Sequence, residues 1–435
     1  MTGDGCDTPW AVLLDGPTAD TARQLVDTIA GRPRATPRAV RPDLAAGGAG
    51  LALAYHQLDL CRPGEGWHAM AAGHLEAAVR GAERMRGRAP GLLGGLGGLA
   101  FAAGRLGYPD LFGPERSGGP DTLGVDWRTV DRYTVDLRTV DRYTVDLRTV
   151  DLHTLDRRRA LDLGSGLTGL GAVLLDHPED PAAVARLETV LTVLGRQVAA
   201  FPGESPGMAH GPAGPLALLA LALSAGVEVP GQVEAVHRAV DRLLVHRRDD
   251  DWGPDWALAE GADQASHQVS HHGADQALHQ VSHQASRHGS GPSGSDRQPL
   301  PASWCHGGPG IARALWLAGT ALDDATLRDL GRETLLAALR RPPELRRIDL
   351  RPGLCPGLAG LLLITLRFAR DTADPAFRPA VRDVAARLID LSGDRYGSGG
   401  SAAPGLLDGA AGVLLALLAA STPVPPGWDR ALLLS

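Results

Sequence analysis

Seven strongly apolar runs of eight to twelve residues lie along the chain, and each follows a short Gly-x-x-Gly core. Leu and Ala dominate these runs and β-branched residues are few, which favours buried helices over strands. Amphipathic segments with charges on one face lie between the runs, at Ala182–Ala199, Gln232–Arg247, Asp324–Arg341 and Phe377–Leu391. The pattern predicts a repeated unit of one buried and one surface helix, about fourteen helices in all, after a first helix near Thr18–Gly31.

The seven cores share one register. They read DLAAGGAG, GLLGGLGG, DLGSGLTG, GMAHGPAG, WCHGGPG, LCPGLAG and LLDGAAG, and their second glycines are spaced by 48, 71, 45, 96, 50 and 52 residues. Spacings near fifty are typical of repeat architectures built from one supersecondary unit. Such helix pairs can stack as an open solenoid or close into a ring. Two rings, inner and outer, would explain why one helix of each unit is apolar all round.

Each of the two long spacings contains a low-complexity insertion. Residues 125–156 repeat a five-residue theme of the type VDLRT, a period that places Val on one face of neither a helix nor a strand. Residues 262–294 carry a duplicated, His-rich tract with a Gly/Ser/Pro-rich end. We expect both to be surface insertions in a single domain that spans residues 1–435, although a pentapeptide β-helix and loose metal binding are the alternatives.

Composition narrows the class of protein. The chain is 44% hydrophobic and 21% charged, with a net charge of −7, so we expect a globular protein without a general basic surface for nucleic acid. The first twenty residues have no basic region typical of a secretory signal, and no apolar run reaches the ~20 residues that span a bilayer. Four cysteines do not make a disulfide framework in a chain of this size. A cytoplasmic location is therefore expected.

Side chains with possible chemistry recur at one place in the repeats. The position before the first glycine of the core holds His210 and His306 in the fourth and fifth units, and the position before that holds Cys305 and Cys355 in the fifth and sixth. In a closed ring these positions converge on one end of the axis. Two thiolates and an imidazole can bind Zn²⁺ and leave a position open for substrate. Two buried, inert cysteines are the plain alternative.

Taken together, the motifs DLGSGLTG, GMAHG, SWCHGGPG, LCPGLAG and LLDGAAG resemble those of the lanthionine synthetase C-like family, of the free-standing cyclase type. The resemblance implies an all-α fold, an α/α toroid of about seven inner and seven outer helices. It also implies a zinc-dependent cyclase that adds peptide cysteine thiols to dehydroalanine or dehydrobutyrine. Its partners would be the dehydrated precursor peptide with its leader and a dehydratase.

The resemblance assigns roles residue by residue. Cys305 and Cys355 match the two zinc cysteines of the family, but Pro356 stands where the family has its third ligand, a histidine. His306 could replace that ligand, with His210 as the fallback. Otherwise His210 matches the active-site histidine that would protonate the enolate, and Asp162 could orient it, although Asp162 also reads as a helix cap. The family's arginine four residues before the first zinc cysteine is absent, and Pro301 stands there.

Two rivals remain open at this point. A non-catalytic scaffold that binds a peptide or thiol would have the same fold without the chemistry. An unrelated α/α-barrel glycosidase would need a pair of carboxylates, for which Asp162 and Asp408 are the candidates.

Overall fold

The computed structural model describes residues 10–31, 41–82, 91–108, 161–200, 205–257, 300–372, 374–396 and 403–435. Both predicted insertions, at residues 125–156 and 262–294, lie outside these ranges. Almost all regular structure in the described part of the chain is helical, as predicted. None of the described helices is both long and apolar enough to cross a membrane.

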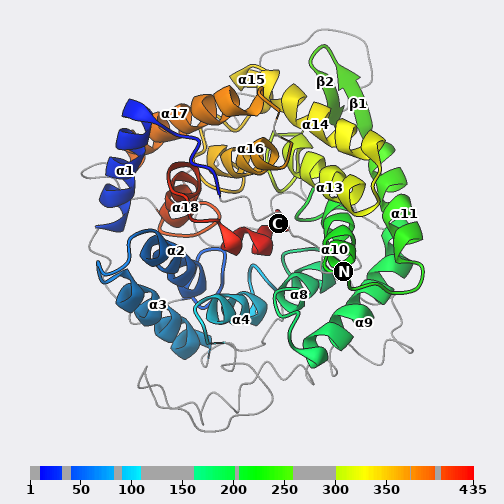
Figure 1. Cartoon of the computed structure of the whole chain (residues 1–435), viewed down its shortest axis with the longest axis horizontal. Coiled ribbons are helices and arrows are strands. Elements are labelled where there is room, and N and C mark those ends of the chain that lie inside the picture. The colour runs from blue at the N-terminus through cyan, green and yellow to red at the C-terminus, as the bar shows by residue number, and fades with distance from the viewer. Residues whose placement is uncertain are drawn as a thin grey trace, which may run out of the picture.

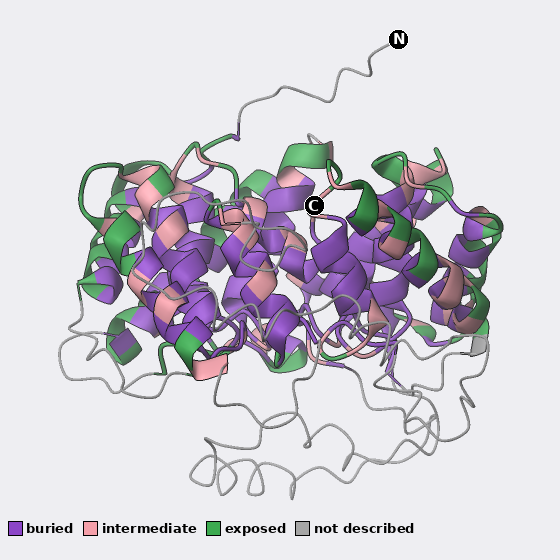
Figure 2. Ribbon diagram, turned by 90° about the horizontal axis from the view of Figure 1, so that it is seen from below, coloured by how far each residue is buried: buried purple, intermediate pink, exposed green. Residues whose placement is uncertain are grey.

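All seven predicted apolar helices are present, and each begins within or directly after its Gly-x-x-Gly core. They are α2 (Gly48–Cys61), α4 (Leu96–Arg105), α8 (Leu167–Leu174), α10 (Ala213–Ser224), α13 (Gly308–Ala321), α16 (Leu358–Thr372) and α18 (Ala410–Ser421). Figure 1 shows these helices arranged around a common centre. They are buried along most of their length (Figure 2), which explains why their sequences lack a polar stripe.

The amphipathic segments form helices farther from the centre (Figure 1). They are α1 (Gly16–Ala30), α3 (Trp67–Ala82), α9 (Pro181–Gln197), α11 (Gln232–Leu244), α14 (Ala325–Arg340) and α17 (Phe377–Tyr396), with short helical pieces η3 (Val198–Ala200) and α15 (Pro343–Arg346). Asp180 and Asp324 cap α9 and α14 by accepting hydrogen bonds from backbone N–H groups of the first turn. Because these helices are amphipathic, the apolar face of each packs inward and its charged face meets solvent.

A small hairpin departs from the all-helical expectation. Strands β1 (Arg247–Asp250) and β2 (Gly253–Trp256) pair antiparallel, with Arg247 opposite Trp256. The predicted surface helix that was expected to reach Arg247 ends at Leu244. Arg341, at the end of α14, donates two hydrogen bonds to the carboxylate of Asp250, at 2.9 and 3.0 Å. The hairpin is thus fastened to the outer side of α14.

The loops that precede the seven apolar helices form a closed belt. We number eight loop positions so that the two glycines of the core are positions five and eight. Backbone hydrogen bonds of 2.9–3.0 Å run from an N–H group of one loop to a carbonyl oxygen of a neighbouring loop. The donor and acceptor residues are Ala45 and Leu93, Leu93 and Gly164, Leu163 and Ala209, Ala209 and Cys305, Cys355 and Leu407, and Leu407 and Ala45. These bonds join six of the seven pairs of neighbouring loops, including the seventh loop with the first, and a disulfide between Cys305 and Cys355 joins the fifth loop with the sixth. The circuit of repeats is therefore closed, and an open solenoid is excluded.

The second glycine of each core allows this close packing. A Cβ added at Gly98 would clash with the carbonyl oxygen of Leu92 and with the side chain of Leu44 in the preceding loop. Gly50 meets Leu44 and, across the closure of the belt, Leu406 in the same way. The residue at loop position two, such as Leu44 or Leu92, is completely buried. Only glycine leaves room here for both the helix start and the neighbouring repeat.

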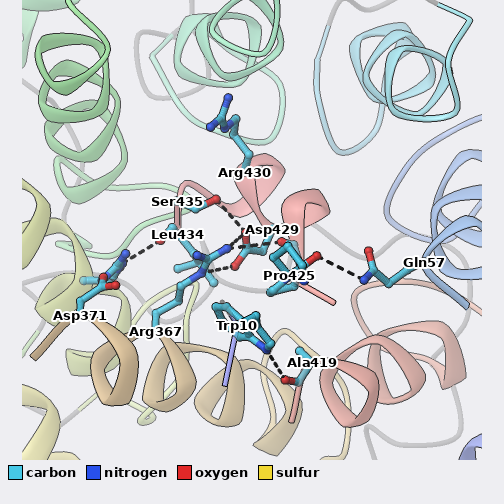
Figure 3. A network of polar contacts seen from close by, with 12 residues as sticks. Trp10, Gln57, Arg367, Asp371, Ala419, Pro425, Asp429, Arg430, Leu434 and Ser435 are labelled. Atoms are coloured by element: carbon cyan, nitrogen blue, oxygen red, sulfur yellow. Dashed lines mark hydrogen bonds and ion pairs between the residues drawn. The ribbon is translucent and has the colours of Figure 1, made fainter. Parts of the chain in front are cut away.

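The C-terminal segment occupies the centre of the molecule. Helix η6 (Gly427–Leu432) lies there (Figure 1), and the carboxylate of Asp429 accepts two hydrogen bonds from Arg367 of α16, at 2.6 and 2.7 Å (Figure 3). The Arg367 guanidinium also lies 4.9 Å from the ring centre of Trp10. Arg313 of α13 donates to the backbone carbonyl of Leu434 at 2.8 Å. The axis is therefore filled by a buried, paired polar network.

Candidate functional site

The predicted site residues lie in four consecutive loops of the belt. Asp162 is in the third loop, His210 in the fourth, Cys305 and His306 in the fifth, and Cys355 in the sixth. Belt hydrogen bonds hold the third, fourth and fifth loops side by side, such as the one from the backbone N–H of Ala209 to the carbonyl of Cys305 at 3.0 Å. A disulfide joins the sixth loop to the fifth. The shared register therefore places these residues at one end of the ring, as expected.

Asp162 and His210 are in contact. The Nδ1 atom of His210 lies 3.2 Å from Oδ2 of Asp162. The Asp162 side chain is 5% exposed, whereas that of His210 is 36% exposed. A buried carboxylate next to Nδ1 fixes the orientation of the ring and favours a proton on that nitrogen. The pair can therefore hold an imidazole in a defined orientation.

The other oxygen of Asp162 organises the loop. Its Oδ1 atom accepts hydrogen bonds from the backbone N–H groups of Ser165 and Gly166, at 2.7 and 2.9 Å, and from the Ser165 hydroxyl at 3.0 Å. Asp162 therefore has both of the roles that the sequence left open, helix cap and partner of His210. One oxygen holds the start of α8 and the other faces His210.

Asp43 shows that the loop role does not require a histidine. It occupies loop position one in the first repeat, as Asp162 does in the third. Its Oδ1 accepts from the backbone N–H of Ala46 at 2.8 Å, and its Oδ2 accepts from Arg41 at 2.7 Å. The two aspartates thus share the loop contact and differ in the partner of the second oxygen. The pairing with His210 is specific to the third repeat among the described loops.

His306 lies against His210. The ring centres of the two histidines are 5.6 Å apart and their planes are inclined by 31°. This contact follows from the register, because both residues occupy loop position four in adjacent repeats. Two imidazoles and one carboxylate, Asp162, are therefore gathered in three neighbouring loops.

Cys305 and Cys355 form a disulfide, with their Cα atoms 6.1 Å apart. Both residues are buried. The hydroxyl of Ser303, which is completely buried, lies 3.5 Å from the sulfur of Cys305. The prediction that the two cysteines approach one point is therefore met, but the contact is covalent.

A Zn²⁺ ion does not fit this form of the site. Metal-binding cysteines ligate as thiolates, and neither sulfur of a disulfide is one. No group of three or more His, Cys, Asp or Glu side chains in the described ranges is arranged to hold a metal ion. Pro356, next to Cys355, has no side-chain donor. The zinc set predicted from the sequence, Cys305, Cys355 and His306, therefore needs the two cysteines in their reduced state.

Two observations go beyond the sequence reasoning. Ser303 occupies loop position one, the position of Asp43 and Asp162, and its hydroxyl accepts a long hydrogen bond from the backbone N–H of His306, at 3.4 Å. The shared loop position with Asp43 and Asp162 is the sequence signal that could have identified Ser303. Asp408, the second candidate carboxylate for a glycosidase, is exposed in the seventh loop, which is not adjacent to the loop of Asp162.

Comparison with known proteins identifies the family. The model of the family "lanthionine synthetase C-like protein" matches residues 133–433, more than half of the chain, and the chain therefore belongs to this family. Among solved structures, a nisin cyclase matches with a TM-score of 0.67 and 18% sequence identity, covering 95% of this chain and 98% of the cyclase. At that identity the likeness shows the fold alone. No curated protein sequence matches the chain.

Proposed function

We propose that the chain is a lanthipeptide cyclase that adds a peptide cysteine thiol to dehydroalanine or dehydrobutyrine and forms a thioether ring. Membership of the lanthionine synthetase C-like family and the fold shared with a nisin cyclase support this class of reaction. The observation that carries the proposal is the His210–Asp162 contact, because it holds an oriented imidazole one loop from Cys305 and two loops from Cys355.

The reaction needs a thiolate as the nucleophile and an acid as the proton donor. The thiolate sulfur bonds to the β-carbon of the dehydro residue, and the electrons of the carbon–carbon double bond move to form an enolate. The enolate α-carbon then takes a proton. Because Nδ1 of His210 faces Asp162, Nε2 is the atom that delivers this proton, and the contact with the carboxylate orients the ring for the transfer.

Zinc belongs to the same proposal. The reduced Cys305 and Cys355 would hold Zn²⁺ with His306 as third ligand, and His210 is the alternative third ligand. When bound, the ion would lower the pKa of the substrate thiol. The proposal further includes one domain over residues 1–435, built as a double ring of seven inner and seven outer helices, a cytoplasmic location, and as partners a dehydrated precursor peptide, its leader and a dehydratase.

The rival function is a scaffold that binds a peptide or thiol without converting it. Two observations favour it: Pro356 removes one metal ligand, and the remaining two cysteines are joined to each other. A scaffold would keep the backbone hydrogen bonds of the belt and the central network, because the site side chains form neither of them.

The test uses a synthetic peptide that carries one dehydroalanine and one cysteine, incubated with reduced, zinc-supplemented protein. Cyclisation removes the alkylatable thiol without changing the mass of the peptide, and mass spectrometry measures both. We expect ring formation well above the rate without protein, and its loss in His210→Ala. Peptide binding with no gain in rate would contradict the cyclase and leave the scaffold.

A further inference from the structure

The belt of loops has one joint that differs from the others. Six of its seven joints are made by a backbone hydrogen bond to the neighbouring loop. The described residues show no such bond between the fifth and sixth loops. At that joint Cys305 and Cys355, both at loop position three, are joined by a disulfide. A covalent bond between side chains thus stands where the repeat elsewhere uses the backbone.

The geometry of the joint suits a disulfide without rearrangement of the belt. The Cα atoms are 6.1 Å apart, within the usual range of about 4.4–6.8 Å. The flanking joints are intact, since Ala209 donates to the carbonyl of Cys305 at 3.0 Å and Cys355 donates to that of Leu407 at 2.9 Å. The same two backbones can therefore carry the pair of cysteines whether or not their sulfurs are bonded.

We propose that Cys305 and Cys355 form a reversible thiol–disulfide site that takes small thiols and disulfides as co-reactants. In oxidation, one cysteine thiolate attacks a low-molecular-weight disulfide and releases one small thiol. The second cysteine thiolate then attacks the mixed disulfide, closes the Cys305–Cys355 bond and releases the second small thiol. Two small thiols reverse both steps and leave as their disulfide.

The surroundings favour this chemistry over a permanent cross-link or a permanent metal site. Cys355 is 8% exposed and Cys305 2% exposed, so Cys355 is the more accessible residue of the pair for a small co-reactant. Pro356 provides no metal ligand beside Cys355. A metal held by fewer protein ligands protects its thiolates less well against oxidation, because affinity falls with each missing donor. The disulfide and the metal are therefore alternative states of one pair.

This inference rests on the proposed function only for the identity of the metal, since the exchange needs no peptide substrate. The test uses the full chain with Cys6→Ser and Cys61→Ser, which leaves Cys305 and Cys355 as the two cysteines. One sample is treated with oxidised glutathione and one with a phosphine reductant. Both are then denatured, alkylated with iodoacetamide and weighed by mass spectrometry, and their zinc content is measured before denaturation.

We expect no alkylation in the oxidised sample and two adducts in the reduced one, with full interconversion by a small dithiol. Zinc is expected in the reduced sample and lost in the oxidised one. The single variants Cys305→Ser and Cys355→Ser should instead keep one bound glutathione after oxidation, because no second thiol displaces it. Two alkylatable thiols after oxidation would overturn the proposal, and zinc retained at the same level in the oxidised sample would overturn the claim that the disulfide and the metal are alternative states. If the exchange proceeds while the reduced protein fails to cyclise peptide, the cyclase proposal fails alone.

Discussion

Replacing Asp162 by Asn separates the two roles of this side chain. Asn keeps an oxygen that can accept from the backbone N–H groups of Ser165 and Gly166, at the positions now 2.7 and 2.9 Å from Oδ1. The new amide NH₂ would face Nδ1 of His210 in place of Oδ2, and two donors cannot bond to each other. His210 must then rotate or take the other tautomer. The loop should survive while the proton donor loses its orientation.

The size of the effect follows from the bond that is lost. A hydrogen bond to a charged group contributes about 1.5–3 kcal/mol, which corresponds to roughly 10- to 150-fold in rate. Because the His210 side chain is 36% exposed, water compensates part of the loss, and we expect the lower end, about 10- to 30-fold. The free energy of unfolding should change by less than about 1 kcal/mol, because the loop contacts remain.

Asp43→Asn is the matched control. Asp43 makes the same contact with its loop but pairs with Arg41 in place of a histidine, so its variant should cyclise peptide at the wild-type rate. The assay compares initial rates of thiol loss for the three proteins at equal concentrations of folded chain, and urea unfolding gives their stabilities. An Asp162→Asn rate within twofold of wild type, or an equal loss in Asp43→Asn, would refute the role given to the His210–Asp162 contact.

Two further predictions concern the fold. Gly310→Ala places a Cβ against the carbonyl oxygen of Trp304 and should lower the free energy of unfolding in urea by about 1–3 kcal/mol. The control is Gly73→Ala, which has open space around it in α3 and should be neutral or stabilising. Equal stabilities of the two variants would count against the tight packing of the belt. Asp429→Ala leaves the buried Arg367 guanidinium without its carboxylate and should lower the free energy of unfolding by about 3–5 kcal/mol. The loss should be smaller when Asp429→Ala is combined with Arg367→Met. An Asp429→Ala variant as stable as wild type would disprove the pairing.

The fold could be predicted because its determinants are local and repeated. Runs such as residues 410–420 are apolar on every side, so they can only be buried helices, and α18 spans nearly the same residues. The glycines at a fixed offset, such as Gly98 and Gly169, marked the places where neighbouring repeats approach. The same register brought His210 and His306 into adjacent loops. Sequence alone therefore gave both the helices and the order of the site loops.

Other features depend on contacts that leave no periodic signal. The β1–β2 hairpin is fastened to α14 through Asp250 and Arg341, which are ninety-one residues apart. The pairing of Arg367 with Asp429 in the centre is equally long-range. The disulfide was not expected, because the resemblance to the family assigned both cysteines to zinc. Register places two sulfurs near each other but does not determine whether they share a metal or a bond.

The groups that close the ring of repeats differ from most of the side chains that form the candidate site at its end. At six of the seven joints, closure uses backbone atoms at loop positions two and three, and between the fifth and sixth loops it uses the Cys305–Cys355 disulfide. The absence of a Cβ at position eight allows the close approach of neighbouring repeats, and the side chain at position four takes no part in these bonds. That position holds Ala46, Gly94, Ser165, His210, His306, Pro356 and Asp408 in the seven loops. The proposed activity, in contrast, would depend on a few of these side chains and on the state of Cys305 and Cys355. A substitution at position four, such as Pro356 where the family has a metal ligand, therefore changes the chemistry of the site while the backbone bonds that close the ring remain.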